Sequence, residues 1–445
     1  MNNSTIKMAA LLLGVLAIHA CKLEAVKDPN FPSVGAVTEN ASKAQLNDLA
    51  IGQVALARNG VDSYLQITGT LGKELFNFNT TESRWMTELN GLKQIDNSAF
   101  YNTATTAFGL PIRQANILLA ALEKTGSVTD KEKNAYRGIA NTFKGLAYLY
   151  QLNAQYKNGV RLNVEDPFKP SKFASYEASL AGIAGFLDQG ATQLDAADTT
   201  FPKTPNLVLP ANYSGFDTPK GFKKFNRAIA LRVAIYQQNW AKAEQLLGQT
   251  FLDEKGSMNL GPKHSFSPSA PDFGNPLVNS TSAIVVAVEK IMDEAEPGDK
   301  RVLSKVVVEN PPLTYSSGVT YSTKYKQVIY TKAEDAIPII RNEELLLIAA
   351  EVAAQQARTP DAVKFINIVR TAAGLPNYSG ATSKDALINA ILKERLYSLW
   401  YEGHRWVDMR RYGKLNEIVL PVAGMKVLEQ LERPVQEVNW DKANP

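Results

Sequence analysis

The chain has 445 residues, and its 48 Lys and Arg against 44 Asp and Glu give a formal net charge of only +4. Hydrophobic residues make up 45% and charged residues 21% of the chain, as in ordinary globular proteins. This composition excludes a disordered, collagen-like or polytopic membrane protein, and the nearly balanced charge argues against nucleic-acid binding, which requires a concentrated basic face.

Residues 1–20 are predicted to be a signal peptide. Their apolar run, residues 8–20, is shorter than the roughly 20 residues that cross a bilayer. Cys21 is the only cysteine of the chain and directly follows a small residue, which resembles a bacterial lipobox, where the signal is cleaved before a cysteine whose thiol is acylated. We therefore predict lipidation of Cys21, with an ordinary signal peptide as the alternative. Residues 21–40 contain Pro and Gly without periodicity and are predicted to be a tether.

Helical periodicity dominates the rest of the chain. Apolar residues recur at helical spacing in residues 41–59, 111–124, 131–156, 176–197, 226–249, 338–357, 361–373 and 384–402. Residues 228–249 and 341–370 resemble tetratricopeptide hairpins, because small residues stand where paired helices approach closely. We predict one mainly α domain over residues 41–445, with tetratricopeptide-like helical hairpins forming a superhelical scaffold, long irregular loops and a few short β-strands.

Two loop-rich insertions interrupt the helices, around residues 199–225 and 255–336. They are rich in Pro, Gly, Ser and aromatic residues, and long loops in compact proteins are usually functional. Short β-branched runs predict three strands, at residues 283–288, 302–308 and 321–330.

Acidic and basic residues gather in the last helical segments. Glu344 and Glu351 lie on a predicted helix with apolar residues on both sides, so their carboxylates should be buried and paired. Glycosidases also use paired carboxylates, but each acid here has an Arg close in sequence, which favours a structural role. The predicted structural ion-pair network consists of Arg341, Glu344, Glu351, Arg370, Glu394, Arg395, Glu402, Arg405 and Asp408.

Three runs near the C-terminus resemble the signature of the SusD/RagB family. Residues 338–351 resemble its pattern P-x-x-R-x-x-E-x-x-L-x-x-A-E, and residues 367–376 resemble N-x-V-R-x-R-A-G-L-P. Residues 394–411 are similar to E-R-x-x-E-x-x-x-E-G-x-R-x-x-D-x-R-R. Their order, spacing and position agree with the family over about residues 325–413.

The resemblance implies a role in nutrient uptake. SusD-like proteins are surface-exposed outer-membrane lipoproteins that bind an oligosaccharide, or in some members a peptide, and deliver it to a SusC-like TonB-dependent transporter without catalysis. The implied partners are therefore this transporter, the ligand and the outer membrane. Few His and Cys residues and no nucleotide or hydrolase motif are present, so we predict no metal, cofactor or catalytic residue. A lipid-anchored helical-repeat scaffold for protein partners, and a glycosidase, are the alternatives.

The predicted ligand-binding residues are the aromatic residues Trp85, Tyr101, Tyr213 and Tyr321. They lie in predicted irregular segments, and aromatic rings offer flat faces on which sugars can stack. Packing in the core is the alternative for each of them. Trp85 is the first candidate because it lies in an irregular polar stretch. We expect Trp85→Ala to weaken ligand binding without lowering the melting temperature.

Overall fold

A computed structural model of the chain describes residues 34–202, 207–280 and 283–445. The predicted signal peptide at residues 1–20, the predicted lipidation site Cys21 and most of the predicted tether at residues 21–40 lie outside the described residues. The last part of that tether is helical, as α2 (Val34–Thr38).

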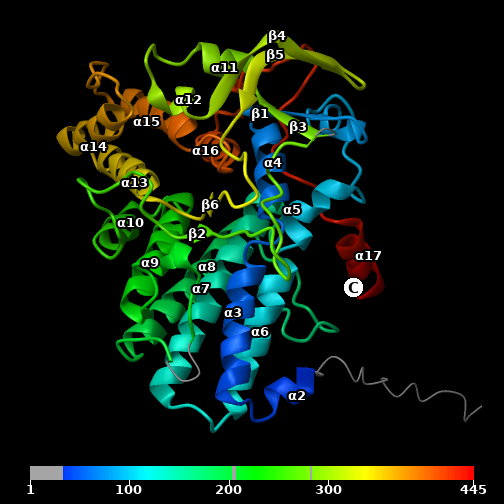
Figure 1. Cartoon of the computed structure of the whole chain (residues 1–445), viewed down its shortest axis with the longest axis vertical. Coiled ribbons are helices and arrows are strands. Elements are labelled where there is room, and N and C mark those ends of the chain that lie inside the picture. The colour runs from blue at the N-terminus through cyan, green and yellow to red at the C-terminus, as the bar shows by residue number, and fades with distance from the viewer. Residues whose placement is uncertain (1–33, 203–206, 281–282) are drawn as a thin grey trace, which may run out of the picture.

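The described chain is mostly α-helical, and consecutive helices pack side by side (Figure 1). Close neighbours include α6 with α7, α7 with α8, α8 with α9, and α13 with α14. The remaining helices are α3 (Lys43–Leu56), α4 (Val61–Leu71), α5 (Thr103–Thr106), α6 (Gly109–Lys124), α7 (Asp130–Gln155), α8 (Tyr176–Asp195), α9 (Pro219–Tyr236), α10 (Trp240–Leu247), α11 (Glu289–Asp293), α12 (Lys300–Leu303), α13 (Asn342–Gln355), α14 (Thr359–Ala372), α15 (Lys384–Ser398), α16 (Arg405–Arg411) and α17 (Val435–Ala443).

Local sequence explains where the long helices begin and how closely they pack. Thr129 and Glu132 form a reciprocal capping box at the start of α7, which satisfies backbone N–H groups that have no partner within the helix. On the same helix, a Cβ at Gly138 would lie 2.4 Å from the Leu194 side chain of α8. The absence of a side chain at Gly138 therefore lets the two helices approach closely.

A four-stranded antiparallel sheet lies at one end of the helical scaffold, at the top of Figure 1. Its strand order is β1-β3-β5-β4, with β1 at Leu75–Asn79, β3 at Ala283–Ala287, β5 at Thr320–Gln327 and β4 at Val306–Ser316. A second sheet pairs β2 (Lys263–His264) with β6 (Ile337–Pro338). The strand β1 follows α4, so the larger sheet joins the N-terminal region to the second predicted insertion.

The segment after α16 returns to the N-terminal half of the chain. Leu431 donates its backbone N–H to the Ala154 carbonyl at 2.9 Å. Arg161 then forms ion pairs with Glu437 at 2.8 Å and Asp441 at 2.6 Å, both on α17. The C-terminal helix is therefore fixed against the segment that follows α7.

The predicted fold class is confirmed, and each predicted helical segment contains a helix. Residues 226–249 hold two helices, as expected for the hairpin predicted in residues 228–249, and Gln238 adopts a left-handed conformation with a φ of 54° between α9 and α10. The first of these starts at Pro219, inside the predicted insertion, where Thr218 caps it. Residues 338–341 are not helical, because Pro338 belongs to β6 and Arg341 is extended. Among the helices of the described residues, the sequence patterns missed α4, α5, α11 and α17.

Two of the three predicted strands are present as β3 and β5. The prediction of a strand over residues 302–308 was wrong in its first part, because Asp299 caps the short helix α12 there. The strand β4 begins only at Val306 and continues to Ser316. The strand β1 was not predicted.

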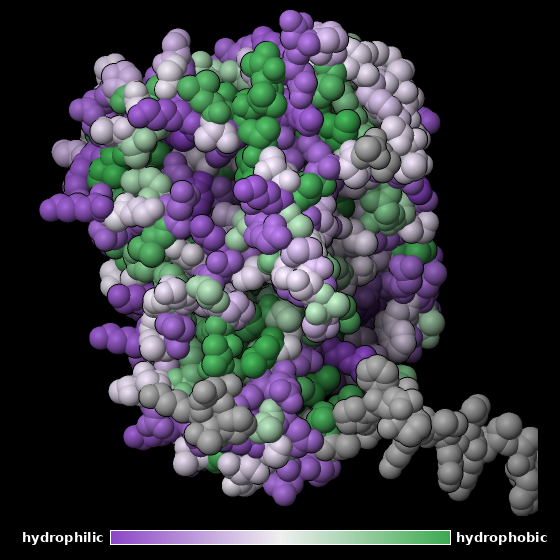
Figure 2. Space-filling view, in the orientation of Figure 1, coloured by the Kyte–Doolittle hydropathy of each residue, from purple (hydrophilic) through white to green (hydrophobic). Residues whose placement is uncertain are grey.

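The surface mixes polar and apolar residues. On the face shown in Figure 2, apolar areas alternate with polar ones. Large apolar side chains that are well exposed, such as Phe168, Val208 and Leu303, are scattered along the chain. In the ranges that the structure describes, none of the helices has the length and apolar character required to span a membrane.

Candidate functional site

Two groups of residues are candidates for function: the buried ion pairs of the last helices and the aromatic residues around Trp85. In the first group, the guanidinium of Arg232 on α9 binds both carboxylate oxygens of Glu344 on α13, at 2.7 and 2.6 Å. Both side chains are almost fully buried. Burial alone would raise the pKa of Glu344, but Arg232 and His404 outweigh it and hold the pKa at about 2.

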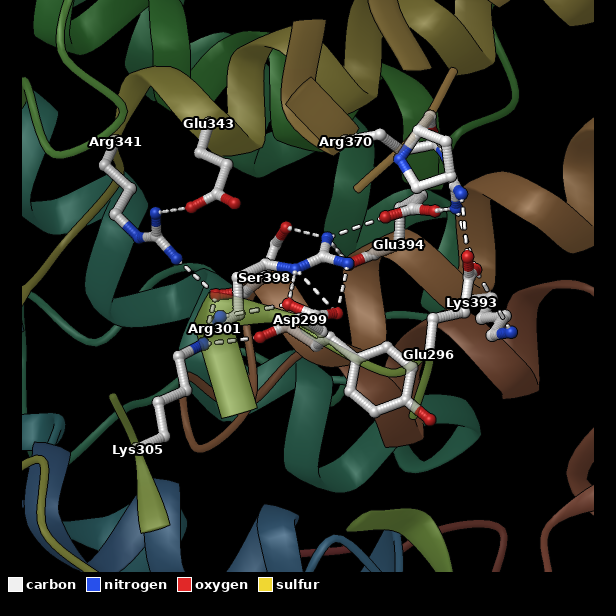
Figure 3. A network of polar contacts seen from close by, with 12 residues as sticks. Glu296, Asp299, Arg301, Lys305, Arg341, Glu343, Arg370, Lys393, Glu394 and Ser398 are labelled. Atoms are coloured by element: carbon white, nitrogen blue, oxygen red, sulfur yellow. Dashed lines mark hydrogen bonds and ion pairs between the residues drawn. The ribbon is translucent and has the colours of Figure 1, made fainter. Parts of the chain in front are cut away.

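Glu394 on α15 lies between two guanidinium groups (Figure 3). It accepts from Arg301 and from Arg370 on α14, each at 2.7 Å. Asp299 also binds Arg301, at 2.6 Å, and Glu296 also binds Arg370, at 2.8 Å. This cluster ties α15 to α14 and to the segment that contains α12.

Arg341 continues the network toward the turn after α15. It pairs with Glu343, to which Figure 3 shows it pointing, and with Glu402 at 2.8 Å. Burial alone would raise the pKa of Glu343, but the Arg341 guanidinium outweighs it and holds this pKa at about 2. Arg341 also donates to the Ser398 carbonyl, which accepts a second bond from Lys305 at 2.6 Å.

Two further acids are held by arginines of α15 and α16. Asp408 accepts from Arg395 at 2.6 Å and from Arg411 at 3.0 Å. Arg411 also binds both oxygens of Glu351, which accepts a third hydrogen bond from the Tyr412 hydroxyl at 2.6 Å. These carboxylates are occupied by guanidinium groups, an arrangement that suits helix bracing better than proton transfer.

The structure places eight of the nine predicted network residues in ion pairs. Arg405 differs, because its Nε donates to the Gly72 carbonyl at 3.2 Å instead of pairing with an acid. Arg341 is the arginine closest in sequence to Glu344, but it precedes α13 in an extended conformation and pairs with Glu343 and Glu402 instead. The arginines at 232, 301 and 411 were not predicted as members, and the partner of Glu344 lies 112 residues away.

Glu74 and Lys73 are buried ionisable residues beside this network. Burial raises the pKa of Glu74 to about 8, against the attraction of Arg405. Burial also lowers the pKa of Lys73 to about 7, although its ammonium donates to the Asn90 side chain at 2.9 Å. Both groups therefore titrate closer to neutral pH than usual.

We expect the stability of Glu74→Gln relative to the wild type to increase as the pH rises from 5 to 7. Folded Glu74 keeps its proton up to about pH 8, whereas the unfolded chain releases it near the ordinary pKa of 4.5. The folded state therefore binds more protons in this window, and its stability falls with rising pH. Thermal denaturation should show the Tm difference, variant minus wild type, growing with pH. The exposed variant Glu254→Gln is the control, and a constant difference for Glu74→Gln would contradict the prediction.

The four predicted ligand-binding aromatics are all packed into the protein. Tyr101 and Tyr213 are each 1% exposed, so neither presents a ring face to a ligand in this structure. Tyr321 is buried with its ring stacked on Phe76 at 4.5 Å. Trp85 is 9% exposed and so is not the open platform that its polar neighbours suggested. The structure brings Trp85 and Tyr101 into one apolar cluster and places Tyr213 and Tyr321 in two other clusters.

Phe100 is the partly exposed ring at this place, and sequence reasoning missed it. It begins the 3-10 helix η2 (Phe100–Asn102), and its ring centroid lies 4.7 Å from that of Trp85, at an angle of 34°. The Arg84 guanidinium carbon lies 5.8 Å from the Phe100 centroid. A partly exposed ring supported by a buried one is a surface on which a flat apolar face can stack.

Polar side chains surround this ring. Arg84 binds Glu82 through two bonds of 2.6 and 2.9 Å and approaches Asp96 at 3.4 Å. Glu88 accepts from the Tyr101 hydroxyl at 2.8 Å. These groups can donate to and accept from ligand hydroxyls around Phe100. We call Phe100, Arg84, Glu82 and Asp96 the Phe100 platform.

The described residues offer no evident metal site. Among them, no group of three or more His, Cys, Asp or Glu side chains is placed so that it could hold a metal ion.

Comparisons with known proteins agree on one family. The sequence model of the SusD family matches residues 312–444. A SusD-like protein of Formosa agariphila is 30% identical over 140 residues, which cover 29% of this chain. That match spans only 27% of the relative's own length.

Solved structures share the fold over nearly the whole chain. A SusD superfamily protein from Bacteroides vulgatus has a TM-score of 0.66 and 16% identity, over 88% of this chain and 96% of its own. Surface glycan-binding protein A from Bacteroides thetaiotaomicron, in complex with laminarihexaose, has a TM-score of 0.68 and 13% identity, over 91% of this chain and 99% of its own. At these identities the likeness establishes the fold.

Proposed function

Because this chain is a SusD-like protein in its fold and in its C-terminal sequence, we propose that it is a surface-exposed lipoprotein that binds an oligosaccharide and delivers it to a TonB-dependent outer-membrane transporter. The observation that carries the proposal is the fold shared with a glycan-binding protein over 91% of the chain. Acylation of Cys21 would attach the protein to the outer membrane. The protein would act by binding alone, with the transporter as its partner.

The Phe100 platform supports a saccharide as the ligand. The partly exposed Phe100 ring rests on the buried Trp85 ring and so is held in place before any ligand arrives. Arg84, Glu82 and Asp96 provide donors and acceptors for hydroxyl groups beside the ring. An apolar face with polar groups at its edge matches a sugar ring, whose faces carry C–H groups and whose rim carries hydroxyls.

A peptide is the second candidate ligand. Glu82, Arg84 and Asp96 carry charges of both signs, which can pair with charged peptide side chains. Binding of a peptide without binding of any glycan would select this alternative within the same importer class.

Phe100→Ala is expected to weaken oligosaccharide binding at least about tenfold, because a loss of about 1.4 kcal/mol corresponds to a factor of ten in affinity. The purified full chain is screened against neutral and acidic oligosaccharides and against peptides, and the affinity for each ligand found is measured by calorimetry. Phe168→Ala is the matched control, since Phe168 is 80% exposed and lies outside the platform. Unchanged affinity in Phe100→Ala would exclude the Phe100 platform as the ligand-binding site. Failure of the wild type to bind any glycan would overturn the saccharide proposal.

The transporter partner is tested separately. The full chain, extracted from the outer membrane in mild detergent, is expected to co-purify with a TonB-dependent transporter. Co-purification with other proteins alone would favour the scaffold alternative.

A further inference from the structure

We propose a second saccharide-binding site in a cavity of about 630 Å³ at the ends of the helical hairpins. The turn between α9 and α10, the C-terminal end of α13, the first turn of α15 and the segment at the end of α16 enclose it. Its volume lies within the range of about 300–1,000 Å³ that is typical of small-molecule sites. Figure 1 shows α10, α13 and α15 at the opposite side of the molecule from the light-blue segment that carries the Phe100 platform.

Two aromatic residues line this cavity, Trp240 at the start of α10 and Tyr412 after α16. Both are partly exposed. The Tyr412 hydroxyl donates to Glu351 at 2.6 Å and accepts from Gln355 at 3.1 Å, which fixes the ring orientation before a ligand binds. The Arg411 guanidinium carbon lies 4.6 Å from the Tyr412 centroid, and the ring also packs against the apolar cluster that contains Ile388. The exposed part of the ring borders the cavity, where a ligand would contact it.

Amide side chains supply most of the uncharged polar lining. Gln238, Gln355 and Asn389 border the cavity from three different elements. An amide carries both donors and an acceptor, and a sugar hydroxyl likewise both donates and accepts. The combination of two rings and three amides therefore fits a polyhydroxylated ring.

The charges of the cavity favour a neutral ligand. Arg411 is already bound to Glu351 and Asp408, and Lys414 pairs with Glu417 at 2.7 Å. Lys384 and Asp385, at the start of α15, add one charge of each sign. Three of the lining residues are basic and one is acidic, but Arg411 and Lys414 are already paired with acids outside the lining. A neutral sugar unit therefore fits better than a phosphate or an acidic sugar.

The experiment isolates this cavity from the Phe100 platform. Saturation-transfer NMR is recorded for the full-length Phe100→Ala variant with glucose, galactose, mannose, xylose and N-acetylglucosamine as probes. We expect a signal from at least one probe. Asn389→Trp, added to this variant, should abolish the signal, because Asn389 is exposed on α15 and a Trp there would fill the cavity.

Lys393→Trp is the matched control on the same helix, since Lys393 is exposed outside the cavity and should leave the signal unchanged. Gln238→Ala is a second test variant, exposed in the turn before α10, and should weaken the signal even if Asn389→Trp fails to fold. Circular dichroism checks the fold of each variant.

The outcomes separate the two sites. Absence of signal in Phe100→Ala, with oligosaccharide binding in the wild type, would overturn the second site and leave the proposed function in place. A signal that Asn389→Trp and Gln238→Ala do not change would also overturn it. Loss of the signal in Asn389→Trp or a weaker signal in Gln238→Ala, with an unchanged signal in Lys393→Trp, would support the second site.

Discussion

Glu344→Ala is expected to lower the free energy of unfolding by about 3–5 kcal/mol, the usual cost of removing one partner of a buried ion pair. The side chains of Glu344 and Arg232 are only 1% and 4% exposed. The substitution would leave the Arg232 guanidinium without its carboxylate counter-charge in the core, although the Ile339 carbonyl at 2.9 Å would still accept from it. Chemical denaturation of the purified variant measures the loss.

An exposed pair provides the control for this prediction. Lys364 and Glu254 also form an ion pair, at 2.6 Å, but their side chains are 50% and 40% exposed. Glu254→Ala should therefore change the stability by no more than about 1 kcal/mol. Equal effects of the two substitutions would show that burial does not determine how much an ion pair contributes to stability. A Glu344→Ala variant as stable as the wild type would exclude a bracing role for this pair.

Trp85→Ala is expected to destabilise the protein by about 3–5 kcal/mol, as is usual when a large core side chain is truncated. This reverses the expectation from sequence alone, which placed Trp85 at the surface and predicted an unchanged melting temperature. The structure packs the indole with Leu89, Trp406 and Phe100 in one apolar cluster. The same substitution should weaken oligosaccharide binding, because Phe100 would lose its support.

Trp85→Phe separates the two effects. Its smaller ring should keep most of the packing and the contact with Phe100, so both stability and affinity should fall less than in Trp85→Ala. Thermal denaturation and calorimetry on the same preparations measure the two quantities. A Trp85→Ala variant with wild-type stability would mean that the indole is not packed as the structure has it.

Sequence patterns predicted the helices well because their information is local. The spacing of apolar residues located α7 and α8 almost to their ends and placed the start of α15 correctly at residue 384. The hairpin predicted in residues 228–249 is also present, with the turn at Gln238 between α9 and α10.

The partners within the ion-pair network could be predicted only in part. Arg395 and Asp408 were both predicted as members of the network without being assigned to each other, and they do pair. The pairing of Glu344 with Arg232 depends on how α9 packs against α13, and the sequence offers no sign of it. Burial of charge could be inferred from the apolar residues around each acid, but the choice of counter-charge required the tertiary structure.

The candidate binding residues were the least predictable part. Trp85 is flanked by polar residues, which suggested exposure, but its environment is set by Phe100 and by Trp406, far along the chain. Phe100 itself lies beside the apolar Ala99 and carries no signal of exposure in the sequence. Which of two neighbouring aromatic rings faces outward depends on the packing of several distant segments.

The return of the C-terminal segment to α7 has a consequence for how the protein matures. Arg161 finds its partners Glu437 and Asp441 at sequence separations of 276 and 280 residues. Because a polypeptide emerges from the ribosome with its N-terminus first, the early helices cannot make these contacts until nearly all of the chain is available. Contacts between such distant segments slow folding. The contacts of α17 therefore form late in folding, and folding intermediates would expose the surface that α17 later covers.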